Sequence, residues 1–190
     1  GFINEHAGHY LFTCLSYDLK NEIEALTSEN KDDIGFPIAV LWKPDLVFNI
    51  NGIDNNCLQG QPTKNDLDFI ESFINDISKE NGEKESFDFQ ARTPKNSYLN
   101  SVNKLKKHIQ RGDIYEVNYC QEYISYNTDL KDVINTYFNL NEITKTPFSS
   151  FFQFDEFTIF CCSPERFLNK RNQELIAQPI KGTSKRGASA

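Results

Sequence analysis

The sequence predicts an α+β fold in which antiparallel sheets pack face to face and helices lie on the outside. The predicted elements run in the order strands, helix, helix, strand, helix, strands, which lacks the regular strand–helix alternation of a parallel sheet. The strands at both ends are rich in phenylalanine, of which the 190-residue chain contains 16. Hydrophobic residues make up 38% of the chain, which is enough for an ordered domain with a sizeable core.

The first part of the chain is predicted to contain short strands. Residues 9–17 are rich in β-branched and aromatic side chains and indicate a buried strand. Residues 18–26 then continue as a short helical segment, because Leu19, Ile23 and Leu26 recur at helical spacing. Further strands are expected at 36–42, 46–50 and 53–58, with Asn51-Gly52 as a hairpin turn between the last two.

Residues 65–79 are predicted to form an amphipathic helix, because their apolar side chains recur every three or four positions. Thr63 or Asn65 is expected to cap its first turn. A charged stretch at 80–86 follows, and it is the place where we expect a flexible joint. This joint separates an N-terminal region, 1–80, from a second region, 87–190.

Residues 94–111 show the clearest helical pattern, and Gly112 supplies the signal for its end. Residues 114–123 then alternate, which predicts a strand with one aromatic, buried face and one polar face. Residues 129–142 return to a helical pattern. The remaining segments are predicted to be strands, at 148–154, 157–162, 167–169 and 174–177.

Composition narrows the classes of function. The net charge of −7 argues against nucleic acid as a partner. No apolar run of about 18 residues is present and the N-terminus lacks the layout of a secretory signal, so we expect a cytoplasmic protein with no membrane contact. The five cysteines show no Cys-x-x-Cys spacing and indicate reduced thiols. The three histidines lack ligand spacing, and a catalytic Cys–His pair stays open as an alternative.

The C-terminal stretch 163–187 carries the residues best suited to chemistry. Glu165 and Lys181 stand 16 positions apart (181 − 165 = 16) at the ends of a predicted strand–turn–strand unit. Such a unit can bring a carboxylate and an amine face to face, as acid–nucleophile chemistry requires. Basic residues cluster here on an acidic chain: Arg166, Lys170, Arg171, Lys181, Lys185 and Arg186. The cluster suits a small anionic ligand better than a polyanion, although on charge alone a solvated basic face is the favoured explanation.

Several short motifs differ in composition from the rest of the chain. They are Leu15-Ser-Tyr-Asp18, Gly112-Asp-Ile-Tyr-Glu-Val-Asn118, Thr146-Pro-Phe-Ser-Ser-Phe-Phe152, Ser163-Pro-Glu-Arg-Phe167 and Gln178-Pro-Ile-Lys-Gly-Thr183. Together, in this order, they resemble the chorismate-utilising enzymes, specifically component I of aminodeoxychorismate synthase and of anthranilate synthase. Glu116 stands where that family usually has glutamine, and Lys145 stands where its loop has a first proline. The last pair of motifs, at this spacing, is the specific signal.

The resemblance implies a fold, an activity and roles for named residues. The fold would be part of that of component I of anthranilate or aminodeoxychorismate synthase. Lys181 would attack C2 of chorismate while the C4 hydroxyl departs, and Glu165 would protonate the leaving hydroxyl. Substrate binding would involve Gly182, Thr183 and Arg186. A lysine at position 181 points to aminodeoxychorismate synthase, because anthranilate and isochorismate synthases generally have alanine there.

The resemblance also implies partners and a longer protein. A glutamine amidotransferase subunit would supply ammonia, and Mg²⁺ would be held by carboxylates in a later portion that this chain lacks. We therefore expect a fragment with half an active site, which is inactive by itself. Two alternatives stay open: component I of anthranilate synthase, and a non-catalytic module that docks a glutaminase partner or binds an amino acid.

Overall fold

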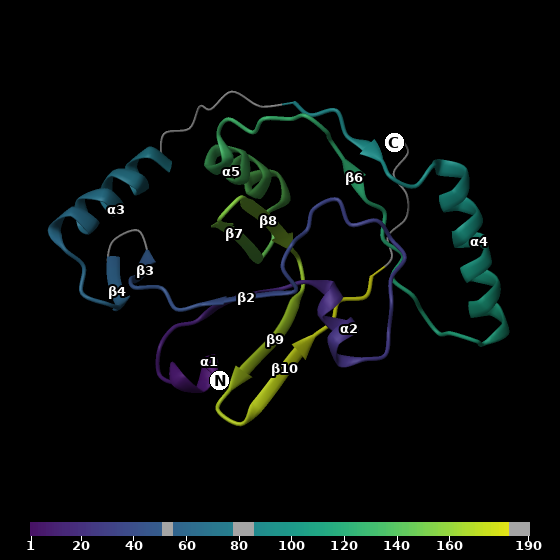
Figure 1. Ribbon diagram of the computed structural model, residues 1–190, viewed down its shortest axis with the longest axis horizontal. Helices are drawn as coiled ribbons and strands as arrows, with labels where there is room; N and C mark the ends of the chain where they lie inside the picture. The colour runs from purple at the N-terminus through teal and green to yellow at the C-terminus, as the bar shows by residue number, and fades with distance from the viewer. Residues whose placement is uncertain (51–54, 78–85, 183–190) are drawn as a thin grey trace. The chain divides into compact units, whose positions relative to one another are not determined.

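The computed structural model describes residues 1–50, 55–77 and 86–182, which fall in two compact units, Gly1–Glu80 and Asn81–Ala190 (Figure 1). Helices and strands are mixed along both units, and every strand pair within the described ranges is antiparallel. The α+β class is confirmed. The strands pair in twos, and the packing of one sheet face on another stays a prediction.

The first unit follows the predicted order of short strands and one long helix. Its elements are α1 (Phe2–Glu5), β1 (Phe12–Leu15), the 3-10 helix η1 (Tyr17–Leu19), α2 (Lys20–Ile23), β2 (Ala39–Trp42), β3 (Val47–Ile50), β4 (Asn55–Gln59) and α3 (Lys64–Ile77). β1 pairs with β2, and β3 with β4. The predicted turn Asn51-Gly52 lies outside the described residues.

The prediction of a buried first strand is wrong. Phe12 and Leu15 of β1 are 38% and 57% exposed. Phe12 stacks on Trp42, its direct partner in β2, with ring centroids 5.6 Å apart. A two-stranded sheet covers its side chains only by such cross-strand pairs, and full burial requires a further layer.

A close approach of the backbone at Gly60 closes the β3–β4 sheet. Gly60 has φ +89°, and a Cβ built there would lie 2.1 Å from the carbonyl oxygen of Asp45. The side chain of Gln59 ties the same region together, because it donates to Pro44 O at 2.5 Å and accepts from the Tyr10 N–H at 2.7 Å. Only glycine fits position 60 without strain.

Helix α3 begins with a reciprocal cap between Thr63 and Asp66. Of the two predicted capping residues, Thr63 and Asn65, Thr63 is the one that forms these bonds. Oδ2 of Asp66 accepts from the Thr63 backbone N–H and hydroxyl, both at 2.7 Å. The Asp66 N–H in turn donates to the Thr63 hydroxyl at 3.3 Å. This is a capping box with aspartate in place of glutamate. Hydrogen bonds from the Thr63 hydroxyl and then from its N–H hold the pKa of Asp66 below its usual value.

The second unit contains the remaining elements. They are β5 (Gln90–Ala91), α4 (Lys95–Arg111), β6 (Tyr123–Ile124), α5 (Val133–Thr144), β7 (Phe148–Phe154), β8 (Phe157–Ser163), β9 (Arg166–Arg171) and β10 (Glu174–Gln178). Asp132 caps α5 by accepting from the Asn135 N–H at 3.0 Å. α5 packs on the β7–β8 hairpin, where the ring of Tyr137 lies 5.7 Å from Phe151 and 6.0 Å from Phe160.

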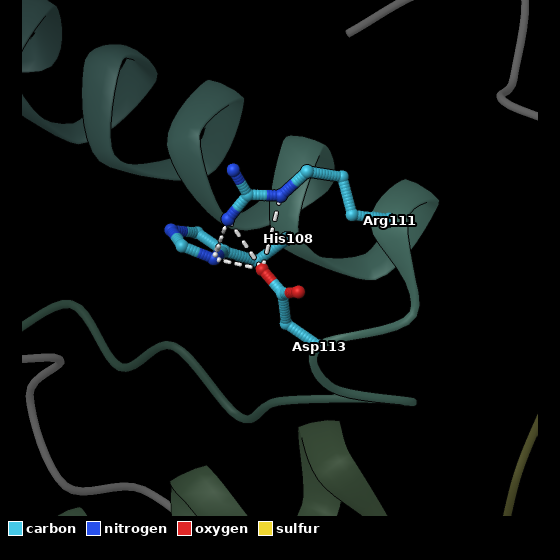
Figure 2. Close-up of polar contacts among 3 residues, drawn as sticks. All are labelled: His108, Arg111 and Asp113. Carbon is cyan, nitrogen blue, oxygen red and sulfur yellow. Dashed lines mark hydrogen bonds and ion pairs between the residues drawn. The ribbon is translucent and has the colours of Figure 1, made fainter.

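The end of α4 is held by backbone and side-chain contacts together. Gly112, at φ +82°, donates to Ile109 O at 3.0 Å, and the Asp113 N–H donates to His108 O at 3.0 Å, which is a Schellman motif. Figure 2 shows the side chains: Oδ2 of Asp113 lies 2.7 Å from Nδ1 of His108 and accepts from Nε of Arg111 at 3.1 Å. His108 is at the surface, with half of its side chain exposed.

The predicted strand over 114–123 does not form. The structure has only Tyr123–Ile124 as a strand there, paired with Gln90–Ala91. Its predicted buried face is open, because Tyr115 is 91% and Tyr123 62% exposed. An alternating segment becomes a strand only where a neighbouring strand supplies hydrogen-bond partners. Among the described residues, the segment after α4 has such a partner only at β6, which pairs with β5.

Across residues 1–50, 55–77 and 86–182, no hydrophobic side chain is fully buried. The expected sizeable core is therefore absent from this part of the chain. Two-stranded sheets and single helices leave one face of each element uncovered, so large side chains such as Phe69 at 70% and Ile143 at 78% stay exposed. None of the helices in the described part has the length and apolar character needed to cross a bilayer.

We predict that Gly60→Ala lowers the free energy of unfolding by about 3 kcal/mol, because strain at positive φ adds to a collision with Asp45 O. Gly8→Ala is the matched control, since Gly8 has φ +88° with no atom near its added Cβ; we expect at most about 1 kcal/mol there. Urea unfolding followed by circular dichroism measures both. Equal losses in the two variants would contradict the proposed collision.

We predict a pH-dependent contribution from the α3 cap. The pKa of Asp66 is lowered in the folded state, so its stabilisation is present above the unfolded value of about 3.9 and is lost as pH falls through the folded value. The stability difference between the natural chain and Asp66→Asn should be constant above about pH 5 and shrink toward pH 2. Asp68→Asn, on the same helix, is the control; a pH-independent difference for Asp66→Asn would refute this cap.

Candidate functional site

The candidate site starts at the end of the β7–β8 hairpin, where Ser163 shapes the turn before Glu165. Ser163 is the last residue of β8 and pairs with Phe148 of β7. Its hydroxyl donates to Glu165 O at 2.9 Å and accepts from the Glu165 N–H at 3.3 Å. Both backbone polar groups of Glu165 are therefore satisfied by one side chain, which is a common role for serine in turns. The half-buried Glu165 is held in place just before β9.

Strands β9 and β10 form the hairpin that carries the predicted lysine loop (Figure 1). Glu174, Leu175 and Ile176 pair in regular register with Arg171, Lys170 and Asn169. The register then shifts, and Gln178 pairs with Arg166. One extra residue of β9 therefore stands opposite Ala177, which defines a β-bulge.

The β-ladder ends at Pro179, and the next backbone N–H donates to the side chain of Glu165. Proline has no N–H and cannot continue a ladder. The following N–H, from Ile180, donates to Oε2 of Glu165 at 3.1 Å. A side chain of the Ser163–Phe167 motif thus binds the backbone of the Gln178–Thr183 motif directly.

Arg166 links three strands beside this contact. Its Nε donates to Oε1 of Gln178 at 3.0 Å. Its guanidinium lies over the ring of Phe148 in β7, with Cζ 4.7 Å from the ring centroid. A guanidinium can bond in its plane and stack on an aromatic face at the same time. The sequence placed Arg166 in the basic cluster and in the Ser163–Phe167 motif, and Gln178 in the Gln178–Thr183 motif, but it assigned neither a role; antiparallel pairing of the two strands brings them together.

Lys181 follows Ile180, the residue whose N–H binds Glu165. Its Nζ donates to Ile180 O at 3.4 Å, and its side chain is exposed. Ile180 therefore contacts both predicted catalytic residues, through its N–H to Glu165 and through its carbonyl to Lys181. Within the described residues Glu165 and Lys181 form no direct ion pair. Both side chains thus contact the same residue, Ile180, and an added Cβ at Gly182 would have no atom within 4 Å.

The remaining predicted substrate-binding residues, Thr183 and Arg186, lie outside the described part of the chain. Lys170 and Arg171 of the basic cluster are exposed on β9. The Thr146–Phe152 motif enters β7, where the Ser149 hydroxyl donates to Thr146 O at 3.0 Å and lies 2.8 Å from the Thr146 hydroxyl. The Gly112–Asn118 motif is the irregular segment after α4. The roles assigned to all these residues stay predictions.

A magnesium ion is expected from the resemblance. Within 1–50, 55–77 and 86–182, no group of three or more His, Cys, Asp or Glu side chains is placed to hold a metal ion. Glu165 is the carboxylate of the lysine loop, and it already accepts from a backbone N–H. The described residues do not fit a magnesium site, so no chemical step below is assigned to the ion.

Comparison with known proteins identifies the family. Residues 2–190 match the family described as chorismate binding enzyme. Component 1 of anthranilate synthase from Cereibacter sphaeroides is 26% identical over 94% of this chain and 39% of that protein. Component 1 of aminodeoxychorismate synthase from Bacillus subtilis is 26% identical over 91% of this chain and 39% of that protein. The corresponding Escherichia coli protein is 31% identical over 50% of this chain and 21% of its own length.

Two conclusions follow from these matches. The chain spans at most 39% of the length of these relatives. Relatives with the two synthase names are similar to it to the same degree, so the comparison leaves the reaction within the family undecided. Since the family match covers nearly the whole chain, this protein belongs to the chorismate binding enzymes.

Proposed function

We propose that the chain is part of component I of an aminodeoxychorismate synthase, which converts chorismate and ammonia to 4-amino-4-deoxychorismate. The observation that carries this proposal is the loop Pro179–Lys181, in which Ile180 binds Glu165 through its N–H and Lys181 through its carbonyl. The amine and the carboxyl group that the lysine-dependent reaction requires are thereby both bound to one residue, Ile180, whereas an anthranilate synthase does not require the amine.

Lys181 has the role of nucleophile in this proposal. The unprotonated amine forms a bond to C2 of chorismate, both conjugated ring double bonds shift by one position, and the bond from C4 to its hydroxyl breaks. Ammonia then adds at C4, both double bonds shift back, and the bond from C2 to the lysine nitrogen breaks. The amine of Lys181 is regenerated, and the net change is replacement of the C4 hydroxyl by an amino group with release of water.

Glu165 has the role of general acid. A hydroxide ion is a poor leaving group, so a proton must reach the C4 hydroxyl as its bond to carbon breaks. Oε2 of Glu165 accepts from the Ile180 N–H, while Oε1 has no hydrogen bond within the described residues. A carboxyl group held through one oxygen can present the other to a ligand. The turn formed by Ser163 fixes the backbone of the acid.

Ammonia from a glutamine amidotransferase subunit, Mg²⁺ and a cytoplasmic location belong to the same proposal. The similar proteins are named "component 1", which supports the presence of a partner subunit. Binding contacts of Gly182, Thr183 and Arg186 to the substrate are also part of it. Component I of anthranilate synthase is the second candidate, supported by the relative from Cereibacter sphaeroides; it would leave Lys181 without a chemical role.

We predict that Lys181→Ala in the full-length protein lowers formation of 4-amino-4-deoxychorismate by at least about 10³-fold, because the nucleophile is lost. The assay contains chorismate, ammonia and Mg²⁺, and mass spectrometry identifies the product. Lys170→Ala, which removes an exposed lysine from β9, should keep wild-type activity. Anthranilate as the wild-type product, or an undiminished rate in Lys181→Ala, would refute the proposed function.

We predict that Glu165→Gln lowers the same rate by roughly 10²- to 10⁴-fold, because proton donation is lost. The amide oxygen of glutamine can still accept from the Ile180 N–H, so the loop keeps its geometry. Glu174→Gln, on the exposed side of β10, is the control for the change of charge. Retention of more than half of the wild-type rate by Glu165→Gln would exclude this residue as the acid.

A further inference from the structure

The β-bulge in the β9–β10 hairpin decides which side chain faces Gln178. The regular pairs of this hairpin, such as Arg171 with Glu174, have residue numbers that sum to 345 (171 + 174). Continued in that register, Gln178 would face Phe167 (345 − 178 = 167). The bulge places Arg166 opposite Gln178 instead. Directly opposed residues in an antiparallel pair point to the same face, so the shift is what allows the hydrogen bond between their side chains.

Burial of an apolar group does not explain this bulge. Phe167 and Leu168, the residues opposite Ala177, are 85% and 54% exposed. In the shifted register, Nε of Arg166 donates to Oε1 of Gln178 at 3.0 Å, and the Arg166 guanidinium stacks on Phe148. β-Bulges commonly re-aim a side chain next to a functional site.

The position of the Arg166–Gln178 pair in the chain connects it with both reactive residues. Arg166 follows Glu165 directly, and Gln178 is the last strand residue before Pro179, Ile180 and Lys181. Beyond Gln178, Pro179 cannot donate, and the bond from Ile180 to Glu165 is the contact that holds the loop to the β9 side in the described residues. The pair therefore lies between the β9–β10 hairpin and the loop that carries Lys181.

We propose that Arg166 and Gln178 are positioning residues that hold the Lys181 loop against Glu165, with Phe148 as the platform on which Arg166 rests. This inference rests on the proposed function, since it assigns Lys181 and Glu165 the two roles that need alignment. Arg166 touches neither reacting group and acts through Gln178 and the strand ends. Within the described residues, loss of the pair leaves the Ile180–Glu165 hydrogen bond to hold the loop, so it lowers the fraction of loops in which acid and nucleophile are aligned.

Misalignment of groups that act in the chemical step lowers kcat, while chorismate affinity depends on other contacts. Arg166→Lys keeps the positive charge but removes the Nε donor and the planar stacking group. Gln178→Leu keeps the size of the side chain but removes the acceptor. Because both changes break one interaction, their effects should not multiply in the double variant.

The test measures kcat and KM for chorismate in the full-length protein. We expect Arg166→Lys, Gln178→Leu and the double variant each to lower kcat by about tenfold and to leave KM within twofold of wild type. Arg171→Lys and Gln173→Leu, exposed residues of the same hairpin, are the controls and should keep wild-type constants. A kcat within twofold of wild type in either single variant, a change confined to KM, or multiplied losses in the double variant would overturn the proposal.

A second measurement does not depend on activity, and its first comparison uses only the wild-type protein. In nitrogen-15 NMR spectra of the wild-type protein, the Nε–H proton of Arg166 should exchange with solvent more slowly than that of Arg171. The Arg166 signal should move in Gln178→Leu and stay in place in Gln173→Leu. Equal exchange at the two arginines would refute the contact. The product made by the wild-type protein decides the proposed function separately, so failure of one proposal is distinguishable from failure of the other.

Discussion

The hydrogen bond from the Ile180 N–H to Oε2 of Glu165 is the contact on which the candidate site depends. It exists because Pro179 ends the β10 ladder and leaves the next backbone donor without a strand partner. A carboxylate is a strong acceptor for such a donor. The carboxylate is available because the hydroxyl of Ser163 satisfies the backbone of Glu165 and fixes its turn. Together with the bond from Arg166 to Gln178, it joins the Ser163–Phe167 motif to the Gln178–Thr183 motif.

The β7–β8 hairpin leads into this contact, since Ser163 is the last residue of β8. The β7–β8 pair is regular over its whole length, and Phe151 stacks on Phe160 across it with Tyr137 of α5 against both rings. Burial raises the pKa of the Tyr137 hydroxyl, and the nearby Cys162 and Cys161 thiols add to this effect. Beyond this aromatic cluster Glu165 is half-buried and Lys181 is exposed.

Local signals predicted most of the elements. The helical pattern before Gly112, the cap at Thr63 and the phenylalanine-rich strands of the β7–β8 hairpin appear in the structure within a few residues of their predicted bounds. These features depend on interactions between residues close in sequence, such as capping bonds and turn conformations. The chemical identity of Glu165 and Lys181 is likewise a property of the sequence, and so is the choice between lysine and alanine at position 181 that separates the two proposed reactions.

Tertiary structure decided what local patterns could not. The alternating segment 114–123 has the composition of a strand, but in the part of the chain that the structure describes it has no strand partner over most of its length, since pairing is a property of two segments and not of one. The bulge that brings Arg166 opposite Gln178 arises from the register of a whole hairpin, which residue spacing does not reveal. The sequence by itself therefore determined the helices, the turns and the reactive residue types. Only the folded chain determined which of those residues meet, because contacts between distant residues follow from strand register and loop path.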